Sequence, residues 1–245
     1  GWQAATVVLA AVLAVAALAL LPLRAALNGE RRPPTGGGLR AMFAPLGIVM
    51  RHRQLRLLSV GSIAYLVPQS CLGTFLVVFL VDRLGLSLTA AGLALSITQG
   101  VGMVARVVWG AIADRMAERM SLLGLLGVIT AVGAVMVMAA DGTWSYALVV
   151  VACCIYGAGA IGWNGVMLAE LARWAPPGQT GAVTGAATAI TFLGAVLGPA
   201  GFGLLRGLSG GYDLGFGLLA AGAAVAGAAL TWEGWRRRLL KTTGK

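Results

Sequence analysis

The stretch "VARVVWGAIADRMAERM" places charged residues in and beside a membrane-like sequence, at a spacing that indicates ion pairing or anion binding. Arg106 stands inside an apolar run, and Gly110 and Asp114 follow it at four-residue steps. In a helix this spacing puts all three residues on one face. Arg106 can bind a carboxylate through its planar fork of donors. Asp114, Arg115 and Arg119 come where the apolar run ends, so we expect them at the edge of a membrane.

The elements that position these residues are predicted to be membrane helices, because the chain is too apolar for a soluble domain. Hydrophobic residues make up 59% of the chain and charged residues 11%, and the mean hydropathy is +0.89. Soluble chains carry about 25% charged residues. Seven uncharged runs are each near or above the ~20 residues that cross a hydrocarbon layer as a helix. They are 1–23, 57–81, 84–105, 120–140, 142–169, 174–205 and 214–232.

The basic residues predict the orientation of these helices. If the helices simply alternate, fifteen of the 18 Lys and Arg residues fall on one side, two fall on the other, and Arg106 lies within a span. Basic loops face the cytoplasm in membrane proteins. The segment 24–56 and the C-terminus are therefore predicted to be cytoplasmic. The net charge of +10 is explained by topology and contact with anionic lipids, and we expect no nucleic-acid partner.

The fold class predicted is an all-α integral membrane protein, with a six-helix transmembrane bundle and one preceding helix. Its domains are a transmembrane helix, a cytoplasmic linker, a six-helix domain and a basic cytoplasmic tail, at 1–23, 24–56, 57–233 and 234–245. Apolar residues at helical spacing among arginines predict a short interfacial helix near the end of the linker. The six bundle helices are expected at about 57–81, 88–112, 121–140, 144–168, 180–205 and 212–233.

Polar residues divide the six helices into two groups. The first, second, fourth and fifth carry polar side chains within their spans, whereas the third and sixth carry almost none. Because polar groups in hydrocarbon must face partners or a watery cavity, four helices are expected to surround a cavity and two to face lipid. The candidate cavity residues are Tyr65, Gln69, Gln99, Arg106, Tyr156, Asn164 and Thr188. For the residues nearest the midplane, Gln69, Gln99 and Tyr156, an interhelical hydrogen bond is an equally good explanation.

This pattern resembles the C-terminal half of a major facilitator superfamily transporter, preceded by the last helix of the N-terminal half. The sequence "GAIADRMAER" is similar to the family's loop signature G-x-x-x-D-R-x-x-x-R, although Glu118 stands where a second basic residue is frequent. The resemblance implies twelve helices in two halves, with the other half absent from this chain. It also implies a cytoplasmic latch, made here of Gly110, Asp114, Arg115, Arg119 and Glu170.

A second motif, "GAVLGPAGFG", resembles the family's glycine-proline motif in the penultimate helix. Gly194, Gly198 and Pro199 are its packing residues, because small residues four apart let helix backbones approach closely. This resemblance is weaker, since glycine and proline are frequent in membrane helices generally.

Two roles for Arg106 remain open from the sequence. In the first it belongs to the gate and pairs with Glu170 or with carbonyls at a helix end. In the second it binds an anionic group of the substrate, a role that the resemblance to organic-anion members of the superfamily implies. Its depth, estimated at ~9 Å inside the cytoplasmic end of its helix, favours the gate.

The function predicted is secondary active transport of a small solute by alternating access. An organic anion and a drug-like or metabolite efflux substrate are the candidate solutes. The alternative is a truncated or non-transporting membrane protein, such as a sensor, that keeps the fold. We expect no enzyme activity, cofactor or metal site, because the spans offer no Ser/His/Asp or Cys/His set.

Further expectations concern the coupling of transport to an ion, the partners and the cellular location. No Asp or Glu lies deep in any span, so these residues do not support proton coupling, and any acid that couples transport to protons or another ion must lie in the missing half. Membrane lipids and that half are the expected partners. A bacterial inner membrane, with the C-terminus in the cytoplasm, is the expected location.

Overall fold

The computed structural model describes residues 2–23 and 39–243 of the chain. These residues divide into two compact units, Gly1–Met42 and Phe43–Lys245. Every regular element in the described residues is a helix and none is a strand. The predicted all-α class is therefore confirmed.

The first unit contains α1 (Trp2–Leu20) and a 3₁₀ turn at Leu21–Leu23. Its apolar segment Thr6–Leu20 is shorter than the segments that qualify as membrane spans, since a span needs about 20 residues. That residues 1–23 cross the membrane stays a prediction. The first part of the predicted linker, residues 24–38, lies outside the described residues.

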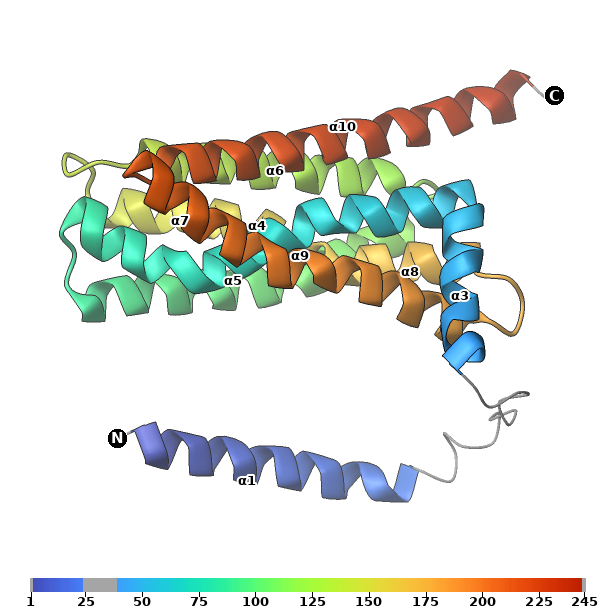
Figure 1. Ribbon diagram of the computed structural model, residues 1–245, viewed down its shortest axis with the longest axis horizontal. Coiled ribbons are helices and arrows are strands. Elements are labelled where there is room, and N and C mark those ends of the chain that lie inside the picture. The colour runs from blue at the N-terminus through green and yellow to red at the C-terminus, as the bar shows by residue number, and fades with distance from the viewer. Residues whose placement is uncertain (1, 24–38, 244–245) are drawn as a thin grey trace. The chain divides into compact units, whose positions relative to one another are not determined.

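The second unit holds six helices that are long and apolar enough to cross a membrane, which confirms the six-helix bundle. They run lengthwise beside one another in Figure 1. α3 (Leu39–Arg51) precedes them, and His52 joins it to α4. The spans are α4 (Arg53–Leu84), α5 (Leu88–Arg115), α6 (Met120–Ala139), α7 with α8 (Tyr146–Gly162, Asn164–Trp174), α9 (Thr180–Ser209) and α10 (Asp213–Thr243).

The helices extend beyond the boundaries that the charges indicated. α4 begins inside the predicted linker, and α10 continues to Thr243 through the predicted tail. The physical reason is visible at Glu233, whose carboxylate pairs with Arg236 and Arg237 at i+3 and i+4. Such pairs stabilise a helix outside hydrocarbon. A run of charges therefore ends an apolar span without ending the helix that carries it.

Glycines bring several helix pairs into close contact. α6 packs against α7 and α10, α5 packs against α7, and α4 packs against α9. A Cβ atom on Gly127 would lie 2.8 Å from the Cα of Gly227, so α6 and α10 touch backbone to backbone. Gly194 and Gly198 of α9 lie against α4, where added Cβ atoms would come within about 3.0–3.1 Å of Val67. This is the close approach expected of small residues at this spacing.

The exposure of α6 bears on its expected contact with lipid. Half of the residues in its most apolar stretch are buried, and α6 packs against α7 and α10. Its exposed large apolar side chains form one outward stripe, made of Leu125, Val128, Val132 and Val135. α9 and α5 are the least buried spans of this chain. Helix 121–140 was expected to face lipid because it lacks polar residues; the outward apolar stripe is compatible with this, and lipid contact stays a prediction.

Candidate functional site

A network of polar side chains surrounds the short interruption between α7 and α8, at Trp163. The Oε1 atom of Gln69 on α4 accepts hydrogen bonds from Trp163 Nε1 and Asn164 Nδ2, each at 3.1 Å. Asn164 Nδ2 also donates to the carbonyl of Ile161 at 3.2 Å. Gln69 and Asn164 are half-buried, whereas Trp163 is buried. These bonds attach α4 to the end of α7 and the start of α8.

Arg106 joins α5 to the same place. Its Nε and Nη2 atoms both lie 3.4 Å from the oxygen of Ile161. α5 continues to Arg115, nine residues beyond Arg106, which is ~13 Å along a helix. Arg106 therefore lies deeper in its helix than the sequence estimate placed it. We call Gln69, Arg106, Trp163, Asn164 and the Ile161 carbonyl the junction network.

The junction network keeps groups that a solute can bind. Within the described residues, Gln69 Nε2, Asn164 Oδ1 and Arg106 Nη1 take part in no hydrogen bond. They supply a neutral donor, a neutral acceptor and a cationic donor. The network contains no carboxylate or imidazole, and its side chains are suited to hydrogen bonding with a polar or anionic group. The described residues also contain no group of three or more metal-ligating side chains.

Tyr65 and Tyr156 lie in the interior of the bundle. The hydroxyl of Tyr65 donates to Leu123 O at 2.6 Å, and that of Tyr156 donates to Pro68 O at 3.0 Å. Both side chains are fully buried. Of the two explanations for Tyr156, a cavity position and an interhelical hydrogen bond, this geometry agrees with the bond. Tyr65 also packs its ring against that of Trp163, with centroids 5.6 Å apart, and so helps to hold Trp163 in the junction network.

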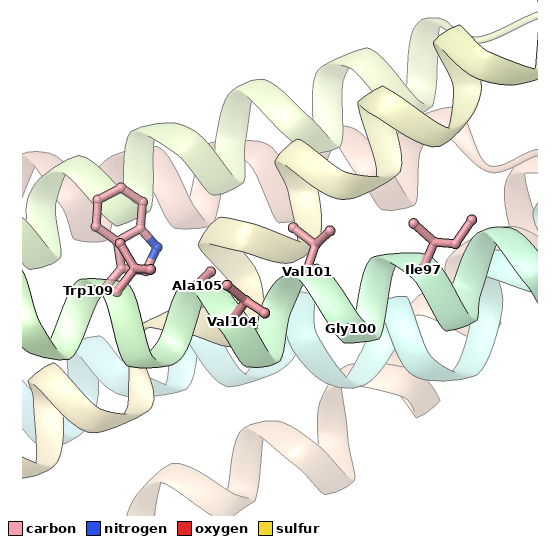
Figure 2. A pocket seen from close by; sticks show the side chains of 7 residues that line it. Ile97, Gly100, Val101, Val104, Ala105 and Trp109 are labelled. Carbon is pink, nitrogen blue, oxygen red and sulfur yellow. The ribbon is translucent and has the colours of Figure 1, made fainter.

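The remaining cavity candidates stand apart from the junction network. Gln99 is exposed and Thr188 is half-buried, and neither side chain makes a hydrogen bond within the described part of the chain. Nearby on α5 is an apolar hollow of about 440 Å³ (Figure 2). Its lining consists of Ile97, Gly100, Val101, Val104, Ala105, Val108 and Trp109. The indole of Trp109 donates to Ala158 O on α7 at 3.1 Å, which fixes one end of this hollow.

The predicted latch residues form two separate groups. In the first, Asp114 is 77% exposed and accepts from Arg119 Nη2 at 3.4 Å. Arg115 is exposed, and a Cβ atom on Gly110 would meet nothing within 4 Å. The loop signature thus folds on itself, and its glycine faces open space among the described residues.

Glu170 makes the second group. Its carboxylate is buried, accepts from Trp174 Nε1 at 2.8 Å and lies 3.6 Å from Arg173 Nη1. Of the two pairings expected for Arg106 in a gate, with Glu170 or with carbonyls at a helix end, the structure has the second. The acceptor is the carbonyl of Ile161, which is close to the end of α7.

Two polar clusters had not been expected. The hydroxyls of Ser62 and Thr191 bond to each other between α4 and α9, and nothing in the sequence marks this pair. Glu233 on α10 is buried against the guanidinium of Arg53, 2.9 Å away, besides its two neighbours on α10. The spacing E-x-x-R-R was visible in the sequence and could have indicated this second cluster.

Comparison with known proteins identifies the family. A family model described as Major Facilitator Superfamily matches residues 1–199. No curated protein matches the chain. Among solved structures, a variant of the Escherichia coli fucose:proton symporter FucP superposes with a TM-score of 0.69 at 16% identity, covering 88% of this chain and 53% of that one. FucP in its outward conformation gives a TM-score of 0.68 at 16% identity, with 94% and 53% coverage.

The structural likeness shows the fold, and the chain spans about half the length of these transporters, 53%. The family model covers most of the chain. Together with the six apolar helices, this makes the chain an integral membrane protein. The chain belongs to the Major Facilitator Superfamily.

Proposed function

We propose that this chain is the C-terminal part of a secondary active transporter, which moves a small polar solute across the membrane by alternating access. Its family and its six spans support this function. The observation that carries the proposal is the junction network. It brings polar side chains from α4, α5 and α8 together at one place in the bundle. Polar groups at such depth are costly and mark solute pathways.

The solute class that the junction network suits best is an organic anion. Ile161 O occupies one edge of the Arg106 guanidinium and leaves Nη1 for another acceptor. No carboxylate of the described residues pairs with Arg106. A solute carboxylate would supply the missing negative charge through a charge-assisted hydrogen bond. Gln69 and Asn164 can orient the neutral part of the solute beside it.

The gate role for Arg106 predicts a different result from the same substitution. In that role the bond to the carbonyl near the end of α7 holds one conformation, so losing it would slow the transport of every solute. In the binding role only the transport of anionic solutes would become slower.

The test measures uptake and efflux of a panel of anionic and neutral solutes in vesicles that contain the full-length transporter. We expect Arg106→Ala to lower anion transport about 10-fold or more, since a hydrogen bond to a charged group contributes ~1.5–3 kcal/mol. Arg106→Lys should restore part of it, because lysine keeps the charge and loses the fork. Neutral solutes should be unaffected. Arg83→Gln is the control, because the salt bridge of Arg83 within the described residues is to the exposed Asp213.

Equal losses for anionic and neutral solutes would assign Arg106 to the gate and overturn the binding role. Transport itself would be overturned if the full-length protein bound solutes but never accumulated or expelled them.

Coupling and orientation belong to this proposal as well. FucP is described as a proton symporter, and we propose proton coupling here with the acidic residue in the N-terminal half. The junction network offers no titratable acid, which supports that placement. The excess of basic residues on one side supports a cytoplasmic C-terminus in a bacterial inner membrane. A protonophore should abolish solute accumulation if protons drive it.

A further inference from the structure

The last turns of α10 expose an aromatic pair beside a basic cluster. Trp232 and Trp235 are 61% and 51% exposed, and their ring centroids are 5.3 Å apart. α10 has 31 residues, or ~46 Å at the helical rise, whereas the hydrocarbon layer is ~30 Å thick. The end of α10 that carries these rings therefore reaches the headgroup region. Tryptophans are enriched at this depth because their rings are apolar and their N–H groups are polar.

The basic cluster carries more positive charge than its one acid can balance. Arg53, Arg236 and Arg237 all pair with the buried carboxylate of Glu233, at 2.9, 3.2 and 3.1 Å. Three guanidinium groups thus share a single negative charge, which leaves an excess of two. The Nε atom of Arg236 is buried and has no hydrogen-bond partner within the described residues.

The three arginines differ in which way they face. Arg237 is 12% exposed, and its guanidinium lies 4.3 Å from the ring centroid of Trp174, within the bundle. Arg53 and Arg236 are 54% and 43% exposed. The excess charge that a ligand can reach therefore belongs to these last two residues. Arg236 follows Trp232 by one helical turn, which brings the accessible charge next to the aromatic pair.

We propose that the C-terminal end of α10 binds the headgroup of an anionic phospholipid. Arg53 and Arg236 hold its phosphate by charge-assisted hydrogen bonds, and Trp232 and Trp235 contact the glycerol and the upper acyl chains. A lipid is favoured over a soluble phosphate because the exposed rings give the site an apolar side that a soluble anion would leave uncovered. This site is separate from the junction network and does not depend on the transport function.

Native mass spectrometry of the intact chain in detergent, with added phosphatidylglycerol or phosphatidylcholine, tests this site. We expect phosphatidylglycerol to be retained preferentially. Arg53→Gln and Arg236→Gln should each weaken its binding about five-fold, since a basic residue near an anionic membrane contributes ~1 kcal/mol. Arg237 continues to hold Glu233 in both variants. Arg115→Gln is the matched control, because it removes one exposed positive charge elsewhere on the chain.

A second variant tests the site while leaving the arginines of the basic cluster, and their contribution to folding, unchanged. Trp232→Leu with Trp235→Leu changes two exposed side chains, so it should keep the fold while lowering retention of phosphatidylglycerol. The site is overturned if Arg115→Gln weakens binding as much as Arg236→Gln, or if phosphatidylcholine is retained equally. If inorganic phosphate displaces phosphatidylglycerol at equal concentration, the ligand is a free anion and the lipid assignment is wrong.

Discussion

Arg106 and Asn164 donate hydrogen bonds to the same oxygen, the carbonyl of Ile161. The bond from Asn164 measures 3.2 Å, and the two from Arg106 measure 3.4 Å. Bonds of 3.4 Å are longer than the usual N–H···O distance and correspondingly weak. Arg106 can therefore leave this oxygen for a stronger, anionic acceptor while Asn164 keeps the carbonyl paired. When a solute draws Arg106 away from the carbonyl of Ile161, the bond from Asn164 still satisfies this buried acceptor.

The hydrogen bond that Gln69 accepts from Asn164 predicts energetic coupling between these two residues. Gln69→Ala and Asn164→Ala should each lower the free energy of unfolding by about 1 kcal/mol, the usual contribution of such a bond. Because both remove the same contact, the double variant should lose less than the two single losses combined. Reversible unfolding in detergent measures the three values. Strict additivity would show that the two amides do not interact in the folded protein.

The sequence predicted the architecture well because hydrophobic runs and basic loops follow directly from the membrane as a solvent. Gln69, Arg106 and Asn164 were likewise identified as candidates, since polar residues are rare in such spans. Their mutual bonds were not predictable, because these depend on the interruption at Trp163, which no proline or charge marks. The end of α10 was misjudged because the sequence shows where hydrophobicity stops, whereas Glu233 and its arginines continue the helix.

Contact between α6 and α10 predicts that two glycines on one helix respond differently to a methyl group. An added Cβ on Gly227 would lie 2.8 Å from Gly124 O, which is backbone and cannot rotate away. Gly227→Ala should therefore destabilise the bundle by ~1–3 kcal/mol through overpacking. Gly222→Ala on the same helix meets nothing within 4 Å, so its effect should be neutral or slightly stabilising. Thermal unfolding of both variants in one detergent makes the comparison, and equal effects would contradict this packing.

The burial of Glu233 predicts a large effect from removing one charge. Glu233→Gln leaves Arg53, Arg236 and Arg237 near one another without their carboxylate, and the unfolding free energy should fall by about 3 kcal/mol. Asp213→Asn is the control, because Asp213 is 59% exposed and lies 3.5 Å from Arg83. Exposed pairs contribute only ~0–1 kcal/mol. If the two substitutions cost the same, Glu233 does not fasten α10 to α4.

The end of the bundle that carries the turn between α9 and α10 predicts a dependence of stability on alkaline pH. Tyr212, in the turn between α9 and α10, donates to Asp82 Oδ2 at 2.8 Å, and Arg206 donates to the same atom at 2.7 Å. Burial, and then the hydrogen bond to Asp82, raise the pKa of Tyr212 from 10.0 to about 12, although Arg206 opposes this rise. The folded chain therefore keeps the phenol proton over a range in which the unfolded chain releases it.

The sign follows from proton linkage. Above pH 10 the unfolded state binds fewer protons at this site than the folded state, so stability is full below pH 10 and is lost as pH rises toward 12. Tyr212→Phe removes the titrating group, so its unfolding free energy should fall less steeply over that window than that of the unsubstituted chain. At neutral pH the variant should be less stable by about 1 kcal/mol, because Asp82 loses a donor. Denaturant unfolding at a series of alkaline pH values measures both effects, and parallel curves for the two proteins would show that Tyr212 ionises alike in the folded and unfolded states.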